Sequence, residues 1–344
     1  MTRVGLVGYG SAGQTIHTPV LREAGVTVAA VSTSNAERAE AARADHPGVE
    51  VVPGLEELLA VPGLDVVVLA SPSGAHAAQA RAVADAGLAC VVDKPLAVDA
   101  PTAADVVRHA AGRGTPLTVF QNRRFDAEQA TVARVVHDRL VGDPFRFEMR
   151  WERWRPVPKD RWRENAPAAE GGGLLLDLHS HLVDAAVQLF GPVVTVAATV
   201  AARTTPAEDD AFLLCRHGSG AVSHLSATSV AGAPGPRVRL LGTEAAYVLV
   251  DFEGEHHPWS GQVNADDEHA GWIYRGDDEP EAVAREAGSQ ADFYRAVAAA
   301  LASSDPQAAM PVDPWDAVHT LAVIDAARVA AAEERVVTVE TPSR

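Results

Sequence analysis

The 344-residue sequence predicts an α/β protein with an N-terminal doubly wound parallel sheet and a C-terminal α+β domain whose open sheet is mainly antiparallel. Short β-branched runs alternate with alanine-rich helical stretches as far as residue 120. Longer runs separated by turn residues follow them. The chain also exceeds the roughly 250 to 300 residues at which a single core stops growing. We therefore expect domains at residues 1–121 and 122–344.

Five short apolar runs in the first half are predicted to be buried strands of a parallel sheet. They are residues 4–7, 26–31, 66–70, 89–92 and 117–120, and the helices between them include residues 35–45, 74–86 and 100–113. Pro19 lies within the first helix. Because proline removes a backbone donor, we expect this helix to break or kink after Thr18.

The second half is predicted to be α+β. Helices are expected at residues 126–139 and 174–190, with an extended Arg- and Trp-rich stretch at 145–155 between them. Alternating runs then predict an antiparallel meander, with strands at residues 193–203, 211–216, 221–229, 237–241 and 245–251. The acidic segment 253–280 is expected to be a surface loop. Helices at 289–302 and 314–332 and a strand at 336–339 follow, and the helix near 314–332 is a candidate for packing back on the first domain.

The charge and the cysteine content limit the function classes. The formal net charge is −17, whereas contact with a nucleic-acid backbone needs a basic surface, so nucleic acid is excluded as the expected partner. No apolar run approaches the ~20 residues of a membrane helix, which predicts a protein without membrane contact. Cys90 and Cys215 lack metal-type spacing and are expected to be buried free thiols. We expect a soluble, cytoplasmic protein with a small-molecule ligand.

A glycine-rich turn near the N-terminus predicts a dinucleotide-binding domain of the Rossmann type. Gly8, Gly10 and Gly13 follow a strand and open a helix. The first glycine permits the tight turn, the second lets the backbone approach the pyrophosphate, and the third allows close packing of helix and strand. The helix N-terminus then faces the phosphates. The expected cofactor contacts comprise Gly8, Tyr9, Gly10, Ser11, Ala12 and Gly13.

The end of the second strand favours NADP over NAD. An Asp or Glu usually follows the turn by about 20 residues and binds the ribose hydroxyls of NAD. Here the strand ends in Ser32-Thr33-Ser34-Asn35, without an acid. Hydroxyl groups there, with Arg38 one helical turn away, suit a 2′-phosphate better. The alternative is that these residues only cap the next helix, and both roles can coexist.

Two further motifs carry candidate catalytic groups. Lys94 lies in Asp93-Lys94-Pro95 at the carboxyl end of a strand, where open α/β sheets bind their ligands. Asp177 and His181 follow the three glycines at 171–173 and are four residues apart on a helix, so they share one face. An aspartate beside a histidine orients the ring and raises its basicity, which suits proton exchange near neutral pH.

Together, the glycine turn, Asp93-Lys94-Pro95 and Gly172-Gly173 with Asp177 and His181 resemble the glucose-fructose oxidoreductase and inositol dehydrogenase family (Gfo/Idh/MocA). The resemblance spans nearly the whole chain. Asp93 departs from it, because the family usually has the longer glutamate there. Residues 121–125 and 160–164 are similar to the branch of NADP-using enzymes of the scyllo-inositol dehydrogenase type.

The resemblance implies which residues form the site. Lys94, Asp177 and His181 match the catalytic lysine, aspartate and histidine of the family, and the open sheet implies a homodimer or homotetramer. Beyond the turn, the end of the second strand gives Ser32, Thr33 and Arg38 as expected cofactor contacts. The resemblance adds Ser71, Pro72, His76, Asp93, Lys94, Asn122, Trp162 and Arg163.

We expect an NAD(P)-dependent dehydrogenase that moves a hydride between nicotinamide C4 and a carbinol or carbonyl carbon of a sugar, an inositol-like polyol or a sugar derivative. His181 would exchange the hydroxyl proton, Asp177 would orient the histidine or the substrate, and Lys94 would stabilise charge on the oxygen. Indoles and guanidinium groups in residues 146–163 suit sugar rings and anions, although only about half of them can face one site. Expected substrate contacts are Arg124, Trp154, Trp162, Asp177 and His181.

Two other function classes compete with a dehydrogenase. One is a metal-dependent hydrolase that uses a set comprising Asp177, His179, His181, Asp184, His217 and His224. Residues two apart diverge on a helix, which argues against this, and no metal is expected. The other is a catalytically silent NADP-binding regulatory protein of the same fold. The intact Lys94, Asp177 and His181 argue against it.

Overall fold

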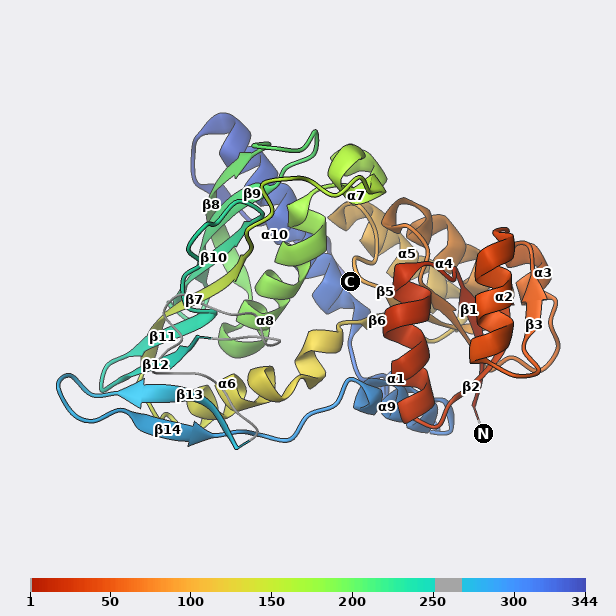
Figure 1. Ribbon diagram of the computed structural model, residues 1–344, viewed down its shortest axis with the longest axis horizontal. Coiled ribbons are helices and arrows are strands. Elements are labelled where there is room, and N and C mark those ends of the chain that lie inside the picture. Colours follow the sequence, from red (N-terminus) through yellow and green to blue (C-terminus); the bar gives the residue numbers. More distant parts are fainter. Residues whose placement is uncertain (1, 251–267) are drawn as a thin grey trace. The chain divides into compact units, whose positions relative to one another are not determined.

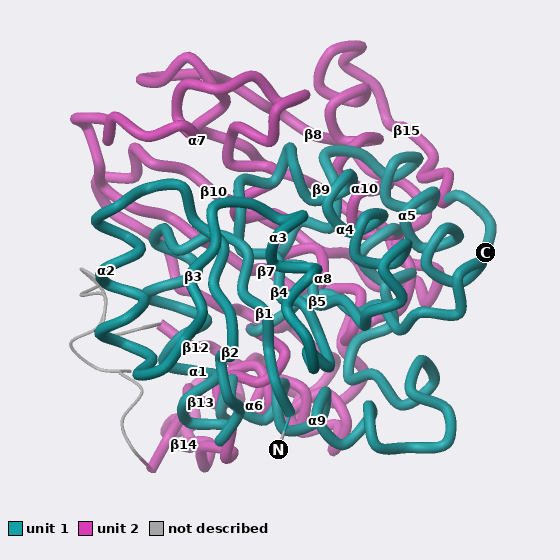
Figure 2. Tube along the Cα trace, turned by 90° about the vertical axis from the view of Figure 1, so that its right-hand side faces the viewer, with its two compact units in different colours: residues 1–122, 289–318, 342–344 teal, residues 123–288, 319–341 magenta. Residues whose placement is uncertain are grey.

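The computed structural model describes residues 2–250 and 268–344 (Figure 1). The chain divides into two units, coloured separately in Figure 2. Unit 1 holds residues 1–122, 289–318 and 342–344, and unit 2 holds residues 123–288 and 319–341. The division differs from the boundary expected at residues 121/122, because 289–318 group with unit 1.

Unit 1 is built on a six-stranded parallel sheet with the order β3-β2-β1-β4-β5-β6. The predicted doubly wound sheet is therefore confirmed. The strands are β1 (Arg3–Val7), β2 (Thr27–Ser32), β3 (Glu50–Val52), β4 (Val66–Leu69), β5 (Ala89–Asp93) and β6 (Leu117–Phe120). The residues of β4 and β6 are all buried, as expected of central strands covered on both faces.

Polar side chains cap two of the helices in unit 1. The side chain of Asn35 accepts a hydrogen bond from the Arg38 amide at the start of α2, and Asp99 accepts one from the Thr102 amide at the start of α5. The helices are α2 (Ala36–Asp45), α3 (Leu55–Leu59), α4 (His76–Asp85), α5 (Ala100–Arg113) and α9 (Ala291–Leu301). Cys90, on β5 of this unit, and Cys215, in unit 2, are buried free thiols as predicted.

The first helix does not break at Pro19 as expected. A π-helix (Ala12–His17) continues directly into α1 (Thr18–Glu23), and only the hydrogen-bonding pattern changes. The amide of Thr18 donates to the Gly13 oxygen, five residues back. Pro19 then occupies the first turn of α1, where the missing N–H costs no hydrogen bond.

Unit 2 is built on a nine-stranded sheet with the order β14-β13-β12-β11-β7-β10-β9-β8-β15. The predicted antiparallel meander of five strands is confirmed only for β8, β9 and β10. Strand β7 lies between β10 and β11, parallel to β10 and antiparallel to β11, so β11 and β12 do not continue that meander. The strands are β7 (Pro144–Glu152), β8 (Val193–Ala201), β9 (Asp210–His217), β10 (Val222–Thr228), β11 (Val238–Gly242), β12 (Ala246–Leu249), β13 (His269–Tyr274), β14 (Glu281–Ala284) and β15 (Val337–Thr338).

The predicted surface loop at 253–280 is wrong at residues 269–274, which form β13 between β12 and β14. The apolar run there is short, and residues typical of loops, such as Gly271 and Asp277, lie on either side of it. Gly271 has φ +82° and packs directly on the Tyr247 ring, so this glycine serves the sheet and not a turn. Residues 253–267 of that prediction lie outside the described residues.

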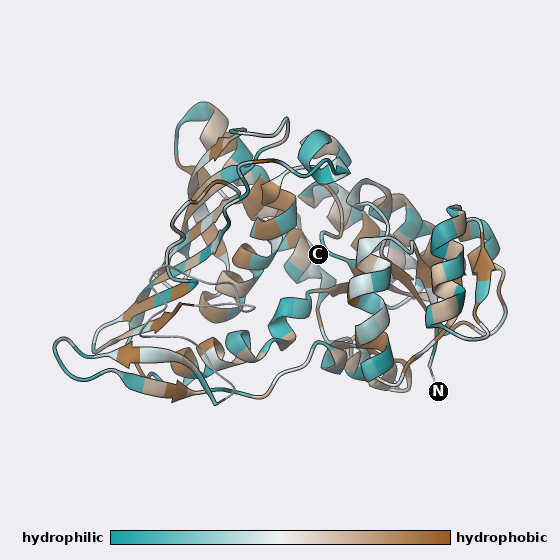
Figure 3. Cartoon of the chain, viewed as in Figure 1, coloured by the Kyte–Doolittle hydropathy of each residue, from teal (hydrophilic) through white to brown (hydrophobic). Residues whose placement is uncertain are grey.

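Helices cover one face of the unit 2 sheet. Figure 3 contrasts the largely hydrophobic α8 (Ser180–Phe190) with the hydrophilic α2 of unit 1. The other helices of unit 2 are α6 (Ala127–His137), α7 (Trp162–Asn165) and the π-helix Leu175–His179, while α10 (Pro314–Glu333) contributes residues to both units. Among the described residues, no helix has both the length and the apolar character needed to cross a membrane.

The glycines of the N-terminal turn give a test of packing. Gly13→Ala is expected to lower the free energy of unfolding by roughly 1–3 kcal/mol, because the new Cβ would lie 2.1 Å from the backbone oxygen of Gly8. Urea denaturation measures this loss. Gly10→Ala is the matched control, since the nearest atoms to its Cβ belong to the Arg38 guanidinium at 3.7 Å. Equal losses in the two variants would contradict the packing role of Gly13.

Candidate functional site

The glycine-rich turn lies at the carboxyl edge of the unit 1 sheet, between β1 and the π-helix. Gly8 has φ +89°, which favours glycine, and its amide donates to the Ser32 oxygen at 2.9 Å. Gly13 packs against the Gly8 oxygen, so the helix starts close to the strand. Tyr9 is buried, and its hydroxyl donates to Asp45. Burial raises the pKa of Tyr9 to about 12, so the hydroxyl keeps its proton.

The residues expected to bind the 2′-phosphate of NADP lie around this turn. The Arg38 guanidinium lies over Gly10, with its Cζ 3.7 Å from the position that a Cβ would take. Ser32 is buried and Thr33 accepts a hydrogen bond from the Asn35 amide, which caps α2 in turn. The capping role is therefore present, and the Arg38 side chain extends from that cap to the glycine turn.

A buried chain of polar groups lies beside Lys94 at the end of β5. His17 Nδ1 lies 2.6 Å from the Tyr294 hydroxyl, and His17 Nε2 lies 3.7 Å from Asp93 Oδ2. Burial and the Asp93 charge raise the pKa of Tyr294 well above its ordinary value, so the hydroxyl donates to His17. The other oxygen of Asp93 accepts from the Lys94 amide at 2.8 Å.

Asp93 is ionised in this setting. Burial by itself would raise the pKa of the carboxyl, but the His17 contact and the charge of Lys94 outweigh it and hold the pKa below the ordinary value. The carboxylate is 13% exposed and is held between His17 and the Lys94 backbone. The backbone that carries Lys94 is thereby tied to the interior of unit 1.

The remaining residues implied to contact the cofactor in unit 1 have protein partners. His76 is buried, with Nδ1 2.8 Å from the Pro95 oxygen and Nε2 2.9 Å from the Ser71 oxygen. Burial lowers the pKa of His76. Ser71 and Pro72 follow β4 at the carboxyl edge, where the Ser71 hydroxyl donates to Gln79. Asn122 follows β6 and donates to Gln290 at 3.0 Å.

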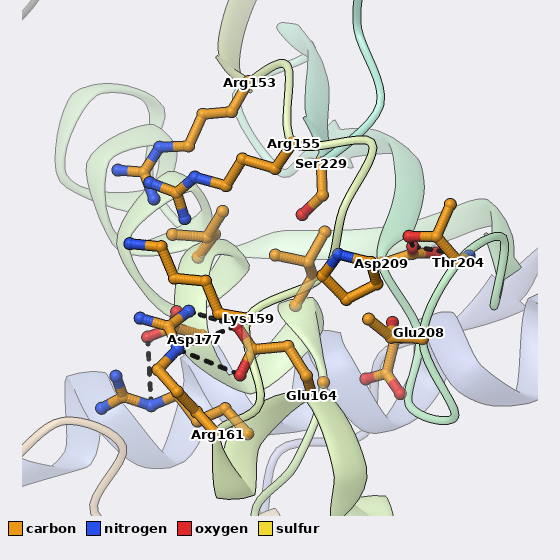
Figure 4. Close-up of a pocket in the computed structure, with 16 residues that line it drawn as sticks. Arg153, Arg155, Lys159, Arg161, Glu164, Asp177, Thr204, Glu208, Asp209 and Ser229 are labelled. Atoms are coloured by element: carbon orange, nitrogen blue, oxygen red, sulfur yellow. Dashed lines mark hydrogen bonds and ion pairs between the residues drawn. The ribbon is translucent and has the colours of Figure 1, made fainter.

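Asp177 lies in the π-helix of unit 2 and lines a pocket of that unit (Figure 4). A close approach sets this helix start, because a Cβ on Gly173 would lie 2.1 Å from the Glu208 carboxylate, and the Gly173 φ is +93°. Arg163 on α7 also lines the pocket, with Nε 3.7 Å from Asp177 Oδ1. Single-turn π segments occur often at functional sites.

His181 follows on α8 and lines a second, mainly apolar pocket of unit 2 with Trp151. The two ring centroids are 5.6 Å apart. Three guanidinium groups surround the Trp151 ring, those of Arg123, Arg153 and Arg237, at 5.1, 5.1 and 4.2 Å from its centroid. The Trp151 ring therefore lies against the His181 ring and also contacts three cationic side chains through its π system.

The expected substrate residues of unit 2 take different positions. Arg124 makes a forked ion pair with Asp184, at 2.8 and 2.6 Å, so its guanidinium already has a carboxylate partner. Trp162 is 38% exposed and stacks under the Arg163 guanidinium. Trp154 is 59% exposed and does not line the pocket of Figure 4, whereas its neighbours Arg153 and Arg155 do. Trp154 forms an isolated antiparallel bridge with Val230 just beyond β7, while Arg153 and Arg155 on either side of it line the pocket.

The residues of the alternative metal site have other partners. His179 is fully buried, and its Nε2 donates to the Leu225 oxygen at 3.3 Å. His217 contacts the Gly191 oxygen and the Ser223 hydroxyl, both at 2.7 Å. Within residues 2–250 and 268–344, no three His, Cys, Asp or Glu side chains gather as a potential metal site.

Sequence reasoning missed His17 and Tyr294. His17 lies four residues after Gly13, near the glycine motif, whereas Tyr294 lies 277 residues after His17 and no local pattern links the two. Thr204, Glu208 and Asp209, which line the pocket of Figure 4, also went unnoticed. They follow β8 in an irregular segment without a motif.

Two family models match the chain. Residues 2–121 match the model of the oxidoreductase family with the NAD-binding Rossmann fold, and residues 130–248 match the Gfo/Idh/MocA C-terminal domain. The first covers the glycine turn and Lys94, and the second covers Asp177 and His181.

Known relatives agree with both models. The chain is 28% identical to scyllo-inositol 2-dehydrogenase (NADP(+)) IolW from Bacillus subtilis, over 98% of this chain and 96% of that protein. It is 37% identical to inositol 2-dehydrogenase from Mycolicibacterium smegmatis, over 41% of this chain and 42% of that protein. The crystal structure of an oxidoreductase from Klebsiella pneumoniae superimposes with a TM-score of 0.86 at 29% identity, over 100% of this chain and 97% of the other.

Burial of His179 predicts a pH dependence of stability. Burial lowers the pKa of His179 from 6.5 to about 4. As the pH falls from about 6.5 to about 4, the unfolded chain takes up a proton that the folded chain refuses, so stability is lost. Between pH 7 and pH 4.5 this group alone should remove roughly 2 to 3 kcal/mol from the free energy of unfolding.

The variant His179→Gln isolates this component, because its amide can still donate to Leu225 but does not titrate. Urea denaturation at both pH values should show a smaller loss for the variant than for the wild type. Identical losses would mean that His179 titrates normally in the folded chain.

Proposed function

Because the chain belongs to the Gfo/Idh/MocA oxidoreductase family, we propose that it is an NADP-dependent dehydrogenase that acts on a CH–OH group. The substrate is a sugar, an inositol-like polyol or a sugar derivative. The cofactor part of this proposal depends on the glycine turn. Gly10 carries no Cβ there, and the Arg38 guanidinium lies beside it. The curated relative that matches nearly the whole chain is itself an NADP(+)-dependent dehydrogenase of a polyol, which supports the substrate class.

The residues around the turn fit a dinucleotide phosphate. Gly10 carries no side chain, and the nearest side-chain atoms over its backbone are those of the Arg38 guanidinium. The amide groups at the start of the π-helix would face a phosphate bound there. Arg38 would hold the 2′-phosphate, helped by the Thr33 hydroxyl. When bound, the nicotinamide accepts or supplies the hydride. Ser71, Pro72, His76, Asn122, Trp162 and Arg163 are proposed as its further surroundings.

Lys94, Asp177 and His181 are proposed as the catalytic residues. Lys94 would stabilise negative charge on the substrate oxygen. Its backbone amide donates to Asp93, which ties the chain at this residue to the interior of unit 1. His181 would take the hydroxyl proton in oxidation and return it in reduction, with its ring fixed against Trp151. Asp177, which is 24% exposed, would bind a substrate hydroxyl or orient the histidine.

The catalytic assignment predicts large losses of turnover. Lys94→Met and His181→Ala should each lower kcat by roughly 100-fold or more, because each removes a group that acts on the reacting oxygen. The measurement is the absorbance of NADPH at 340 nm with a panel of polyols, aldoses and keto sugars.

The dissociation constant for NADPH, from fluorescence titration, should stay within about threefold of the wild type in the His181→Ala variant. Normal turnover in either variant would refute the assignment. Binding of NADPH without turnover on any polyol or sugar by the wild type would favour a regulatory protein.

The proposed cofactor preference depends on Arg38. Arg38→Ala should weaken NADP binding by roughly tenfold or more, through the loss of a charge-assisted contact with the 2′-phosphate, and should leave NAD binding nearly unchanged. Titration of the wild type and the variant with both dinucleotides measures this. A tenfold preference of the wild type for NAD would overturn the proposal.

A further inference from the structure

The chain uses lysine at only two positions. Of its 29 basic residues, 27 are arginine, and the two lysines are Lys94 and Lys159. Lys94 is proposed as catalytic above. Lys159 lines the pocket of Figure 4 together with Asp177. A compact ammonium group in a chain that otherwise uses guanidinium groups points to a specific requirement at this pocket.

The pocket is rich in basic side chains, namely Arg153, Arg155, Lys159, Arg161 and Arg163. Three of the five contact other side chains of unit 2. Arg161 pairs with Glu164, Arg163 lies near Asp177, and Arg153 packs on the Trp151 ring. No described acidic residue lies within ion-pair distance of Arg155 or Lys159. In Figure 4 the Arg153, Arg155 and Lys159 side chains point toward the same side of the pocket.

The acidic residues of the pocket do not neutralise these two cations. Asp209 is taken up by its own loop, where it accepts hydrogen bonds from the Arg203 amide and from Thr204. The Glu208 carboxyl lies against the Gly173 backbone, and burial raises its pKa. Glu164 is bound by Arg161. The pocket thus keeps uncompensated positive charge in a chain whose formal net charge is −17.

We propose that Arg155 and Lys159 form an anion-binding subsite, which takes a phosphate or carboxylate group beside Asp177. An arginine fork binds two oxygens of such a group, and a lysine adds a point charge that adapts to the third. The substrate class that follows rests on the proposed function, because Asp177, which lies beside this subsite, is proposed there as a catalytic residue. The substrate is then an acidic or phosphorylated sugar or polyol, unless the anion is a phosphate of the dinucleotide itself.

Direct binding tests the subsite without any turnover. Isothermal titration calorimetry with inorganic phosphate is carried out on the wild type, Arg155→Gln and Lys159→Met. Arg216→Gln is the matched control, since Arg216 is exposed on β9 of the same unit and does not line the pocket. Each pocket variant should weaken phosphate binding by roughly tenfold, while the control binds like the wild type.

Circular dichroism melts equal to that of the control would show that the variants fold. Equal phosphate affinity in all four proteins, or no binding by the wild type, would overturn the subsite. This outcome leaves the proposed dehydrogenase function standing, because that function is tested by turnover of the Lys94 and His181 variants.

Two further measurements identify the source of the anion. If it is the substrate, the variants raise KM for phosphorylated or carboxylated sugars and leave NADP binding unchanged. If it is the cofactor, the variants raise the dissociation constant for NADP and phosphate competes with NADP. Either result supports the subsite. Unchanged values for every charged ligand contradict it.

Discussion

The buried chain from Tyr294 through His17 to Asp93 determines much of unit 1. It joins α9, the first helical segment and the end of β5, three parts of the sequence that share no local signal. A buried carboxylate is tolerated only with compensating partners, and removing one partner leaves the charge uncompensated at a cost of several kcal/mol. The return of residues 289–318 to unit 1 and the position of the Lys94 backbone therefore depend on the same set of contacts. The aspartate at position 93 suits this arrangement, because a shorter side chain can accept from the next amide while it faces His17.

Both candidate sites begin with a π-helical turn that a glycine permits. In unit 1 the segment Ala12–His17 follows Gly10 and contains Gly13, and in unit 2 the segment Leu175–His179 follows Gly173. At both places a Cβ would collide with a neighbouring group, with the Gly8 oxygen at Gly13 and with the Glu208 carboxylate at Gly173. The glycines therefore do more than free the backbone. They let a helix start within contact distance of its support, which fixes the direction of the side chains that follow, Asp177 among them.

The fold class followed from periodicity, because central strands such as β4 and β6 are continuous β-branched or apolar runs. The edge strand β3 was missed because it has three residues and begins with Glu50. The segment holding β13 was misjudged because its glycine serves a ring contact with Tyr247. Of the candidate site, the glycine turn and Arg38 were predictable from local sequence. The partners of Asp93 and the walls of the Figure 4 pocket were not, since they come from residues far apart in the chain whose meeting depends on tertiary packing.

Charge distribution connects the two candidate sites. An acidic protein repels anions at long range, so a site for an anionic ligand must supply a local field of the opposite sign. Here Arg38 lies at the glycine turn, and Arg155 and Lys159 line the pocket that also contains Asp177. None of these three cations has a carboxylate partner among the described residues. Many other arginines of the chain are paired on the surface, as with Arg295 and Asp292, where screening leaves little net effect. Cations gathered at one place attract phosphate or carboxylate groups at short range, and salt screens their field within about 10 Å, so the surface as a whole stays unattractive to polyanions.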